Sequence, residues 1–460
     1  MADKGVGSGA NAASEVYENV TNPFCGTLTD DLKIERTGTT LKVVKNGSPR
    51  TNAWFERTLP AAHPQVGGKD VSLDDAVAAA AKHIRESKQP LFGGLATDVE
   101  GVRATLALAD RAGAVVDHAL SEAGLRNHRV VQTSGWITST LTETRNRADL
   151  IIIVGTDIAK LHDRFFERIV CTPNSMFEDI AAKRTVVFIG EGLDASAAKG
   201  PRVGEVIELP CPNARLTEVL GVLSARLRGA ALPTQQTEAA GGGKKGGILS
   251  SLLSRSRGGG NDGAEVAGVK LSLIDAVVEK CKAAKYGVMA WSGSSFNFPQ
   301  ADLAVHLISE IVKELNVTTR FAGLPLGGNE GAASFASVTT WQTGYPGRIS
   351  YASGAPVFDP YRYSIGRMVA DNEGDLLLWI SSFTTDLGPP STRMPTIVLG
   401  TPGLRMSQPP QVFIPVGTPG IDHAGTLVRC DSVVSLPLKD LGRSRLPRAA
   451  DVLAAIEKAL

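Results

Sequence analysis

Short apolar runs alternate with amphipathic segments of helical period along most of the chain. One helical segment begins at Ser72 with an N-cap pattern, and a second runs from Asp98 to Ala112, with the apolar run Pro90–Gly94 between them. Strands that alternate with helices pair in parallel, because each crossover helix must cover a face of the sheet. The sequence therefore predicts an α/β protein with parallel sheets.

The same alternation predicts the remaining elements. Further strands are expected at 150–154, 185–190, 204–209, 286–291, 317–321, 375–380, 395–399, 411–415 and 427–430. Further helices are expected at 213–228, 271–284, 300–315 and 448–460. Residues 15–70 have another pattern, in which Leu41–Lys45 is followed by Asn46-Gly47, a pair that favours a type I′ hairpin turn. A small antiparallel sheet is expected there.

Composition narrows the class of protein. A chain of 460 residues is long enough for about two to four packed units. Its formal net charge of +1 gives no global field for nucleic acid or an anionic membrane, and its apolar runs are too short to cross a bilayer. The five cysteines, at 25, 171, 211, 281 and 430, are scattered and odd in number, which favours unpaired thiols in a reducing cytoplasm. Residues 1–14 are interpreted as a flexible tail, not a signal peptide.

The alternation of short apolar runs with amphipathic segments stops at residues 230–268. They include the glycine-rich stretches Gly241–Gly247 and Arg255–Gly260, which offer too little apolar surface to offset the entropy of ordering. We expect a flexible insertion here. The alternative is that Ile248–Leu253 docks as one helical turn on a partner.

A metal-binding pattern without its ligands stands near the N-terminus. Asn22, Cys25 and Thr29, followed by Asp30-Asp31, have the spacing of a Cys-x-x-Cys-x-x-x-Cys-Asp-Asp loop, but Cys25 alone is a cysteine. A four-iron cluster needs four thiolates, which Asn and Thr cannot supply.

Three further segments resemble the B subunit of formylmethanofuran dehydrogenase, a member of the molybdopterin oxidoreductase superfamily. They are Thr142–Asp149 with the following Leu150–Gly155, Trp341–Pro346 with the later Gly354–Pro360, and the bend Gly323–Asn329. The resemblance implies two layered α/β domains with parallel sheets, a small N-terminal β-rich domain and no C-terminal barrel domain. The implied divisions are a tail 1–14, a remnant cluster domain 15–70, one α/β domain of 71–120 and 330–425, a second of 121–329 with the insertion 230–268, and a C-terminal return with a helix, 426–460.

The chain departs from that pattern at each redox component. Trp54 lies near the position of the fourth cluster cysteine, and Ser121–Gly124 lies where the metal-ligating cysteine or selenocysteine should be. The active-site arginine of the bend is replaced by glycine, at Gly327 or Gly328. A molybdenum or tungsten centre needs a soft ligand and an electron relay. We therefore expect the pterin cofactor and the iron–sulfur cluster to be lost, with no metal ligand and no catalytic residue in this chain.

The resemblance then implies the redox-inactive relative, the B subunit of the formyltransferase/hydrolase complex of methylotrophic one-carbon metabolism. In that family the complex converts formyl-tetrahydromethanopterin to formate through a methanofuran-type carrier, and the chemistry resides in the hydrolase and formyltransferase subunits. Two alternatives stay open. One is the active B subunit of a molybdenum- or tungsten-dependent formylmethanofuran dehydrogenase, which would need the cluster thiolates. The other is an independent α/β enzyme with a nucleotide in the old pterin groove, which would need a phosphate-binding loop after a strand.

Five basic residues flank the region of the missing metal ligand and are candidates for contact with the carrier's glutamate-rich tail. They are Arg126, His128, Arg129, Arg145 and Arg147. The favoured interpretation is an ordinary set of solvated or paired side chains.

Other polar residues have plain structural explanations. His162, Asp163 and Arg164 match a His-Pro-Arg-like segment that faces the pterin in the family, and here a hydrogen-bonded structural network is expected. We expect Cys25 to be a small buried hydrophobe, Asp30 and Asp31 to form a turn before a strand at 32–35, and Gly327–Gly331 to be a tight turn, not a phosphate loop.

Overall fold

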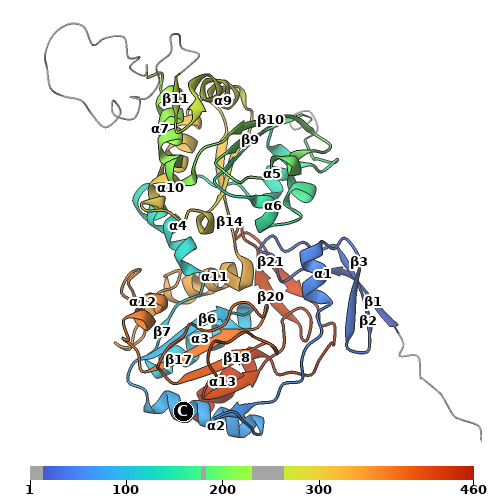
Figure 1. Cartoon of the computed structure of the whole chain (residues 1–460), viewed down its shortest axis with the longest axis vertical. Coiled ribbons are helices and arrows are strands. Elements are labelled where there is room, and N and C mark those ends of the chain that lie inside the picture. Colours follow the sequence, from blue (N-terminus) through green and yellow to red (C-terminus); the bar gives the residue numbers. More distant parts are fainter. Residues whose placement is uncertain (1–13, 178–182, 231–263) are drawn as a thin grey trace, which may run out of the picture. The chain divides into compact units, whose positions relative to one another are not determined.

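The computed structural model describes residues 14–177, 183–230 and 264–460, which form two compact units. Unit 1 combines the chain up to Ser121 with Gly328–Leu460, and unit 2 is Glu122–Gly327. Each unit has its own sheet with helices packed on it (Figure 1). The expected mixed α/β class with parallel sheets is confirmed.

Unit 1 is built on a nine-stranded sheet with the order β16-β15-β7-β6-β17-β18-β19-β4-β5. The five strands from β7 to β19 are parallel, and the short strands at both edges are antiparallel. The bounds are β4 (Gln65–Val66), β5 (Lys69–Asp70), β6 (Pro90–Ala96), β7 (Val115–Val116), β15 (Ile349–Ser350), β16 (Val357–Phe358), β17 (Leu376–Ser381), β18 (Thr396–Gly400) and β19 (Val412–Pro415). The central strands are continuous apolar runs because both of their faces are buried.

Helices cover the two faces of this sheet unequally. Four of them contribute to one core, in which Leu378 is buried, and α12 contributes to the core on the other face, in which Leu377 is buried. The bounds are α2 (Leu73–Glu86), α3 (Val99–Ala112), α11 (Ala332–Thr343), α12 (Ile365–Ala370) and α13 (Ala449–Ala459). As expected, Ser72 caps α2 by accepting from the Asp75 N–H at 3.1 Å.

The N-terminal part of unit 1 is the expected small antiparallel sheet, but its turn was mispredicted. The sheet consists of β1 (Ser14–Val20), β2 (Leu32–Thr37) and β3 (Thr40–Lys45), so the hairpin turn lies at Gly38-Thr39. Asn46-Gly47 leads instead into α1 (Pro49–Phe55). Ser48 caps this helix and Pro49 occupies its first turn, a pair of helix-start signals that outweighs the hairpin preference. A separate ribbon joins β20 (Gly425–Val428) and β21 (Ser435–Leu438).

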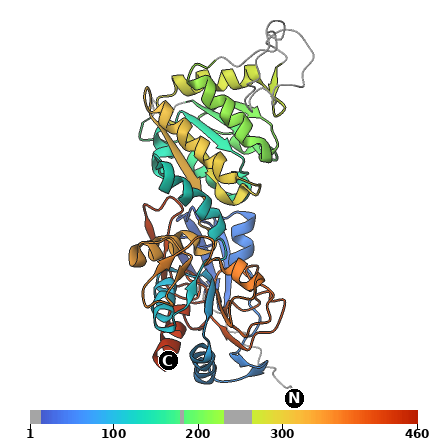
Figure 2. The ribbon, with the colours of Figure 1, turned by 90° about the vertical axis from the view of Figure 1, so that its left-hand side faces the viewer.

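Unit 2 contains a fully parallel five-stranded sheet with the order β10-β9-β8-β13-β14. Its strands are β8 (Leu150–Val154), β9 (Arg184–Ile189), β10 (Val203–Leu209), β13 (Gly287–Ser292) and β14 (Phe321–Leu326). Its helices are α4 (Ser121–Ser134), which starts at the unit boundary, α5 (Leu141–Arg147), α6 (Ile158–Leu161), α7 (Leu216–Leu227), α9 (Leu271–Ala283) and α10 (Ala301–Leu315). Helices α7, α9 and α10 lie side by side on one face of the sheet (Figure 2). A short hairpin joins β11 (Glu265–Val266) and β12 (Val269–Lys270).

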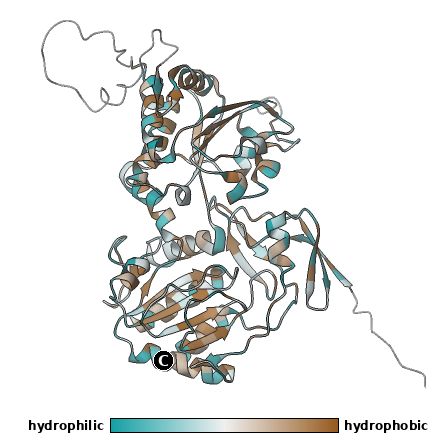
Figure 3. Ribbon diagram, viewed as in Figure 1, coloured by the Kyte–Doolittle hydropathy of each residue, from teal (hydrophilic) through white to brown (hydrophobic). Residues whose placement is uncertain are grey.

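The strand predicted at 317–321 is wrong. The strand β14 starts at Phe321, and Val317 lies in the turn after α10 with its side chain 79% exposed. The Asn316 side chain stabilises this turn by donating to the Val312 carbonyl at 2.7 Å. The β-branched run Val317–Thr319 has strand-forming composition but no buried face. By contrast, the central strands β8 and β17 are apolar and buried along their whole length (Figure 3).

Candidate functional site

The loop that resembles a cluster-binding motif is closed by its own polar side chains. Asn22 donates from Nδ2 to Thr51 Oγ1 at 3.0 Å and accepts from the Phe24 N–H at 3.0 Å. The Asn22 N–H donates to the Thr29 carbonyl at 2.8 Å, so two positions that the resemblance assigns to cluster ligands are joined through the backbone. Asn22 is 2% exposed, and its amide therefore occupies space that a thiolate and a cluster would need.

The remaining cluster positions are also unsuited to iron. Cys25 is buried, as expected, and its Sγ lies 3.1 Å from Thr27 Oγ1. Thr29 Oγ1 is buried without a hydrogen-bond partner among the described residues. Trp54 stacks on Phe24, with ring centroids 5.9 Å apart. A hydroxyl, an amide and an indole in place of three thiolates do not fit a four-iron cluster.

The two aspartates that follow the loop precede β2, as the sequence predicts. Asp30 is exposed, and the Asp31 carbonyl accepts from Asn46 Nδ2 at 2.8 Å. Their position at the start of a strand fits a turn.

The glycine-rich bend after β14 is a tight turn, as predicted. It contains a single 3₁₀ turn, Asn329–Gly331, and Gly328 has a φ of +77°. A Cβ on Gly328 would lie 3.1 Å from the Cβ atoms of both Cys430 and Ala333. At Gly328 the left-handed backbone and these close neighbours disfavour a larger side chain, whereas a Cβ on Gly327, the other position that the resemblance offers for the arginine, would have Ser292 Oγ as its nearest neighbour at 3.9 Å.

This bend packs against the degenerate cluster loop. The Gly26 N–H donates to Asn329 Oδ1 at 2.7 Å, and the Cys430 N–H donates to the Gly26 carbonyl at 2.8 Å. Segments from three distant parts of the sequence are thus tied together at the place where the resemblance puts a redox centre.

The carboxylate of Glu330 was missed by the sequence analysis and occupies a central position in unit 1. Ligands of doubly wound sheets bind at the carboxyl ends of the strands, where the strand order reverses. In unit 1 this point lies between β6 and β17, next to Thr97 and Thr384. Glu330 is hydrogen-bonded there by the backbone and side chain of Thr384, and a Cβ on Gly331 would lie 2.4 Å from the Thr97 carbonyl. The chain thus places its own carboxylate at the usual ligand position.

Burial shifts the pKa values of the ionisable side chains in this region towards their neutral forms. Burial raises the pKa of Glu330 to about 7, although Thr384 opposes the shift by hydrogen bonding. His118 lies within 3.1 Å of the Glu330 carbonyl through Nε2, and its Nδ1 accepts from the Leu120 N–H at 3.0 Å. These contacts fit a neutral imidazole with the proton on Nε2, and burial lowers the pKa of His118 to about 4.

The corresponding point of unit 2 lies between β8 and β13, where polar side chains fill the strand ends. Thr156 Oγ1 accepts from the Ser292 N–H at 2.9 Å, and Ser292 Oγ lies 2.8 Å from Ser294 Oγ. Gly155 and Gly190 pack so closely that a Cβ on Gly190 would lie 3.1 Å from the Gly155 Cα. The hydroxyls of Ser292 and Ser294 thus bond each other, and the Thr156 hydroxyl is engaged by a backbone N–H. Sequence patterns did not identify them, because isolated Ser and Thr carry no characteristic spacing.

The segment His162–Arg164 follows α6 and forms hydrogen bonds and an ion pair, as expected. His162 is fully buried, and its N–H donates to the Ile158 carbonyl at 2.8 Å. Arg164 forms a two-pronged ion pair with Glu167, with distances of 2.6 and 2.9 Å. These contacts are internal to unit 2.

The five basic candidates lie on two helices of unit 2. On α4, Arg126 donates to the Gly293 carbonyl at 2.8 Å, and Arg129 lies 3.9 Å from the Asp302 carboxylate. Burial lowers the pKa of His128, which disfavours its cationic form. On α5, the exposed Arg147 guanidinium lies 5.0 Å from the Phe177 ring centroid, and the Arg145 carbonyl accepts from Arg184. Ser121–Gly124, the segment of the missing metal ligand, forms the first turn of α4.

Two adjoining cavities open at the carboxyl ends of the strands of unit 1. Their volumes are about 510 and 300 Å³, and Arg57 lines both. Arg57 Nη2 donates to the Phe383 carbonyl at 2.8 Å and to Thr401 Oγ1 at 3.1 Å. Burial, together with nearby Arg443, lowers the pKa of Arg57 to about 10. The arginine thus serves chiefly to join the ends of two strands.

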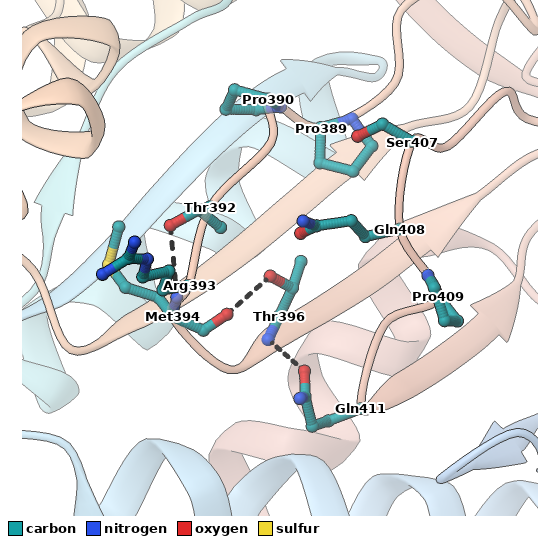
Figure 4. A pocket seen from close by; sticks show the side chains of 10 residues that line it. All are labelled: Pro389, Pro390, Thr392, Arg393, Met394, Thr396, Ser407, Gln408, Pro409 and Gln411. Carbon is teal, nitrogen blue, oxygen red and sulfur yellow. Dashed lines mark hydrogen bonds between the residues drawn. The ribbon is translucent and has the colours of Figure 1, made fainter.

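A third cavity, of about 90 Å³, lies at the opposite edge of the sheet (Figure 4). Its lining includes Thr396 and Gln411, and the Thr396 N–H donates to Gln411 Oε1 at 2.7 Å. Because these residues stand at the amino ends of β18 and β19, the cavity is not at the edge where such sheets bind ligands.

Two broader searches cover only the described ranges. Within 14–177, 183–230 and 264–460, no group of three His, Cys, Asp or Glu side chains is placed to hold a metal ion. No helix in those ranges is long and apolar enough to span a membrane.

Comparison with known proteins gives three relatives that match most of the chain. The B subunit of tungsten-containing formylmethanofuran dehydrogenase 2 of Methanocaldococcus jannaschii is 25% identical over 434 residues, which cover 91% of this chain and 92% of that protein. The protein of the same name from Methanococcus maripaludis is 23% identical over 435 residues, with the same shares covered. The B subunit of the formyltransferase/hydrolase complex of Methylorubrum extorquens is 24% identical over 366 residues, or 79% of this chain and 87% of that protein. No family model matches the chain.

A solved structure supports the same relationship at the level of the fold. It is the crystal structure of the formyltransferase/hydrolase complex of Methylorubrum extorquens with methylofuran, in which the matching chain has a TM-score of 0.65 and 24% identity. The match covers 86% of this chain and 98% of that chain. The chain is therefore homologous to the B subunits of the formyltransferase/hydrolase complex and of formylmethanofuran dehydrogenase.

Proposed function

We propose that this chain is a non-catalytic structural subunit of a formyltransferase/hydrolase complex. The complex would convert formyl-tetrahydromethanopterin to formate through a methanofuran-type carrier in one-carbon metabolism. Its hydrolase and formyltransferase subunits would be the partners of this chain, in the cytoplasm. The observation that carries this proposal is the Asn22 amide, which stands at a cluster-ligand position and is bonded to Thr51 and Phe24.

Sequence identity does not separate the two possible functions, because the dehydrogenase and complex subunits are 23–25% identical to this chain. The residues at the cluster and bend positions distinguish the two possible functions. An active dehydrogenase subunit needs cluster thiolates and a positive group at the bend, whereas this chain has Asn22 and Thr29 at cluster positions and the glycines Gly327 and Gly328 at the bend. We therefore favour loss of the iron–sulfur cluster and of the molybdenum- or tungsten-pterin, over the alternative of an active dehydrogenase.

The finer domain arrangement is part of the same proposal. It consists of a remnant cluster domain at 15–70, two α/β domains and a C-terminal return, without a barrel domain. The independent-enzyme alternative needs a phosphate loop after a strand, and the two switch points described above hold the Glu330 carboxylate and the hydroxyls of Thr156, Ser292 and Ser294 instead.

Of the five basic candidates, we propose Arg129 and Arg147 as the ones able to meet a carrier tail. Both are exposed, whereas Arg126 is largely covered and His128 is held towards its neutral form. Exposed cations act mainly through long-range attraction, which salt screens. Carrier binding by the assembled complex should therefore weaken as ionic strength rises, and further in a variant with Arg129→Gln and Arg147→Gln.

The experiment that tests the main proposal is purification of the native assembly by a tag on this chain. We expect formyltransferase and hydrolase subunits in stoichiometric amounts, and release of formate from formyl-tetrahydromethanopterin. Electron-acceptor-dependent formylmethanofuran oxidation by the same preparation would overturn it.

A further inference from the structure

The cavity of about 300 Å³ in unit 1 is lined by two arginines that retain unused hydrogen-bond donors. The turn before β3 and the chain after α1 form part of its wall, and both elements are blue in Figure 1. Its charged lining residues are Glu56, Arg57 and Arg443. We call this space the arginine cavity.

Arg57 uses one of its three guanidinium nitrogens to join strand ends. Its Nη2 donates to the Phe383 carbonyl at 2.8 Å and to the hydroxyls of Thr401 at 3.1 Å and Thr418 at 3.3 Å, all of them uncharged acceptors. Its Nε and Nη1 are buried and have no hydrogen-bond partner in the part of the chain that the structure describes. A buried donor without an acceptor is unfavourable and is rare in native proteins.

Arg443 adds a third unused donor. It is 4% exposed, and its Nε and Nη2 donate to the two carboxylate oxygens of Asp422 at 3.0 and 2.6 Å. Its Nη1 is buried and has no hydrogen-bond partner among the described residues. Burial, and next the charge of Arg443, lowers the pKa of Arg57, so the two guanidinium groups are close enough to repel each other. An anion held by both would relieve this repulsion.

The charges at the cavity indicate the charge of the ligand. Arg443 is neutralised by its ion pair with Asp422, whereas the hydrogen bonds of Arg57 go to uncharged oxygens. Three carboxylates favour the charged form of Arg57, each more weakly than burial or Arg443 opposes it; they are Asp422, Glu330 and Asp386. Glu56 is exposed to solvent and adds a negative charge to the lining. The balance favours a ligand with a single negative charge over a polyanion.

The rest of the lining indicates the body of the ligand. Its apolar members are Leu59, Pro60, Ala61, Ala62, Pro402 and Leu446. A bare inorganic ion would leave these side chains uncovered, whereas the carbon chain of an organic acid would bury against them. Sites for small molecules combine such apolar walls with a few polar groups, in volumes from about 300 Å³ upwards. A carboxylate supplies two acceptor oxygens, and its hydrogen bonds with arginine are among the strong ones.

We propose that the arginine cavity binds a small organic monocarboxylate, which accepts hydrogen bonds from Arg57 and Arg443. The inference goes beyond the proposed function, which assigns no ligand to unit 1, and does not depend on it. An acidic peptide carries the same carboxylate chemistry. Its further negative charges would meet Glu56 and no additional cation in the lining that the structure describes, so the free acid is favoured.

The test is isothermal titration calorimetry of the purified full chain with four probes at constant ionic strength. The probes are butyrate, its uncharged analogue butyramide, inorganic phosphate and triglutamate. We expect butyrate to bind at one site per chain, at least about tenfold more tightly than the other three. Absence of butyrate binding, or equal binding of butyrate and butyramide, would overturn the proposal. Tighter binding of phosphate or of triglutamate would assign the cavity to an inorganic oxyanion or to an acidic peptide and likewise overturn it.

Two variants locate the binding site. Arg57→Gln should weaken butyrate binding by at least about tenfold. The matched control is Arg405→Gln, which removes a 78% exposed guanidinium that lines only the neighbouring cavity and pairs with Asp386, and it should leave binding unchanged. Thermal unfolding verifies that both variants are folded. Butyrate binding that survives Arg57→Gln, or that both substitutions weaken equally, contradicts the assignment to this cavity.

A measurement on the wild type decides the question if Arg57→Gln does not fold. Crystals of the wild-type protein grown with 4-bromobutyrate should show the anomalous signal of bromine inside the arginine cavity. Bromine bound elsewhere, or absent, would refute the assignment.

Discussion

The Asn22 amide donates to Thr51 Oγ1 at 3.0 Å, and both residues are buried. Thr51 Oγ1 also lies 2.8 Å from Oγ of Ser48, the N-cap residue of α1. A position that the resemblance assigns to a cluster cysteine is thus part of the network that starts a helix. The loop is held by hydrogen bonds at this position, and its stability should depend on the amide.

Substitution of Asn22→Ala should lower the free energy of unfolding by about 1–3 kcal/mol. The variant loses the bond to Thr51 and leaves the Phe24 N–H without its acceptor. Urea denaturation followed by circular dichroism measures the change.

Thr29→Val provides the matched control in the same loop. The Thr29 hydroxyl is buried without a hydrogen-bond partner among the described residues, so a methyl group of similar size should be neutral or slightly stabilising. Equal destabilisation by the two substitutions would contradict the role given to the Asn22 amide.

Glu330 should make stability depend on pH. Its pKa of about 7 in the folded chain exceeds the ordinary value of 4.5, so the folded state binds more protons than the unfolded state between these pH values. The stabilisation from the protonated carboxyl is therefore present below pH 4.5 and is lost as the pH rises through about 7.

Substitution of Glu330→Gln removes this titration and keeps a similar shape. The variant should gain stability relative to the wild type as the pH is raised from 5 to 8, by on the order of 2 kcal/mol. Comparing the two proteins at each pH cancels the contributions of other groups, such as Asp117, whose pKa burial raises to about 6. A stability difference that stays constant with pH would show that Glu330 does not titrate as described.

The sequence predicted the parallel strands well because burial on both faces leaves an unmistakable apolar run. Leu150–Val154 was located to the residue for this reason. Prediction from the sequence failed where the local preference of a segment differs from what its neighbours and the surrounding fold require. Asn46-Gly47 has hairpin composition, but Ser48-Pro49 starts a helix, and Val317–Thr319 has strand composition without a sheet to join.

The candidate site was predictable only in part. The absence of ligands at Asn22 and Thr29 is visible in the sequence, whereas the position of Glu330 depends on a left-handed backbone, with φ of +54°, that no spacing rule reveals. The contacts of Arg184 could not be predicted from the sequence either. It is fully buried and donates to the carbonyls of Ala148, Ile169 and Val170, contacts that arise only when β9 packs against the end of α5 and the helical turn Phe166–Val170.

Metal analysis checks the expected loss of cofactors. The purified assembly should contain less than about 0.1 iron, molybdenum or tungsten per copy of this chain, since a four-iron cluster would give four irons per chain. Inductively coupled plasma mass spectrometry measures this directly. Stoichiometric iron with visible cluster absorbance, removed by Cys25→Ser, would restore the active-dehydrogenase alternative.

The predicted insertion can be tested by shortening it, although residues 231–263 lie outside the described residues. The elements on either side, α7 and β11, contact each other in unit 2, so a short bridge can join them. Loop-closure entropy grows only slowly with length, by about 0.6 kcal/mol for each doubling. Replacing Gly241–Gly260 with a short Gly/Ser bridge should therefore leave the melting temperature, complex assembly and formate release unchanged. If assembly fails while the shortened chain keeps its melting temperature, Ile248–Leu253 is a docking element, because a folded chain would then have lost a binding surface and nothing else.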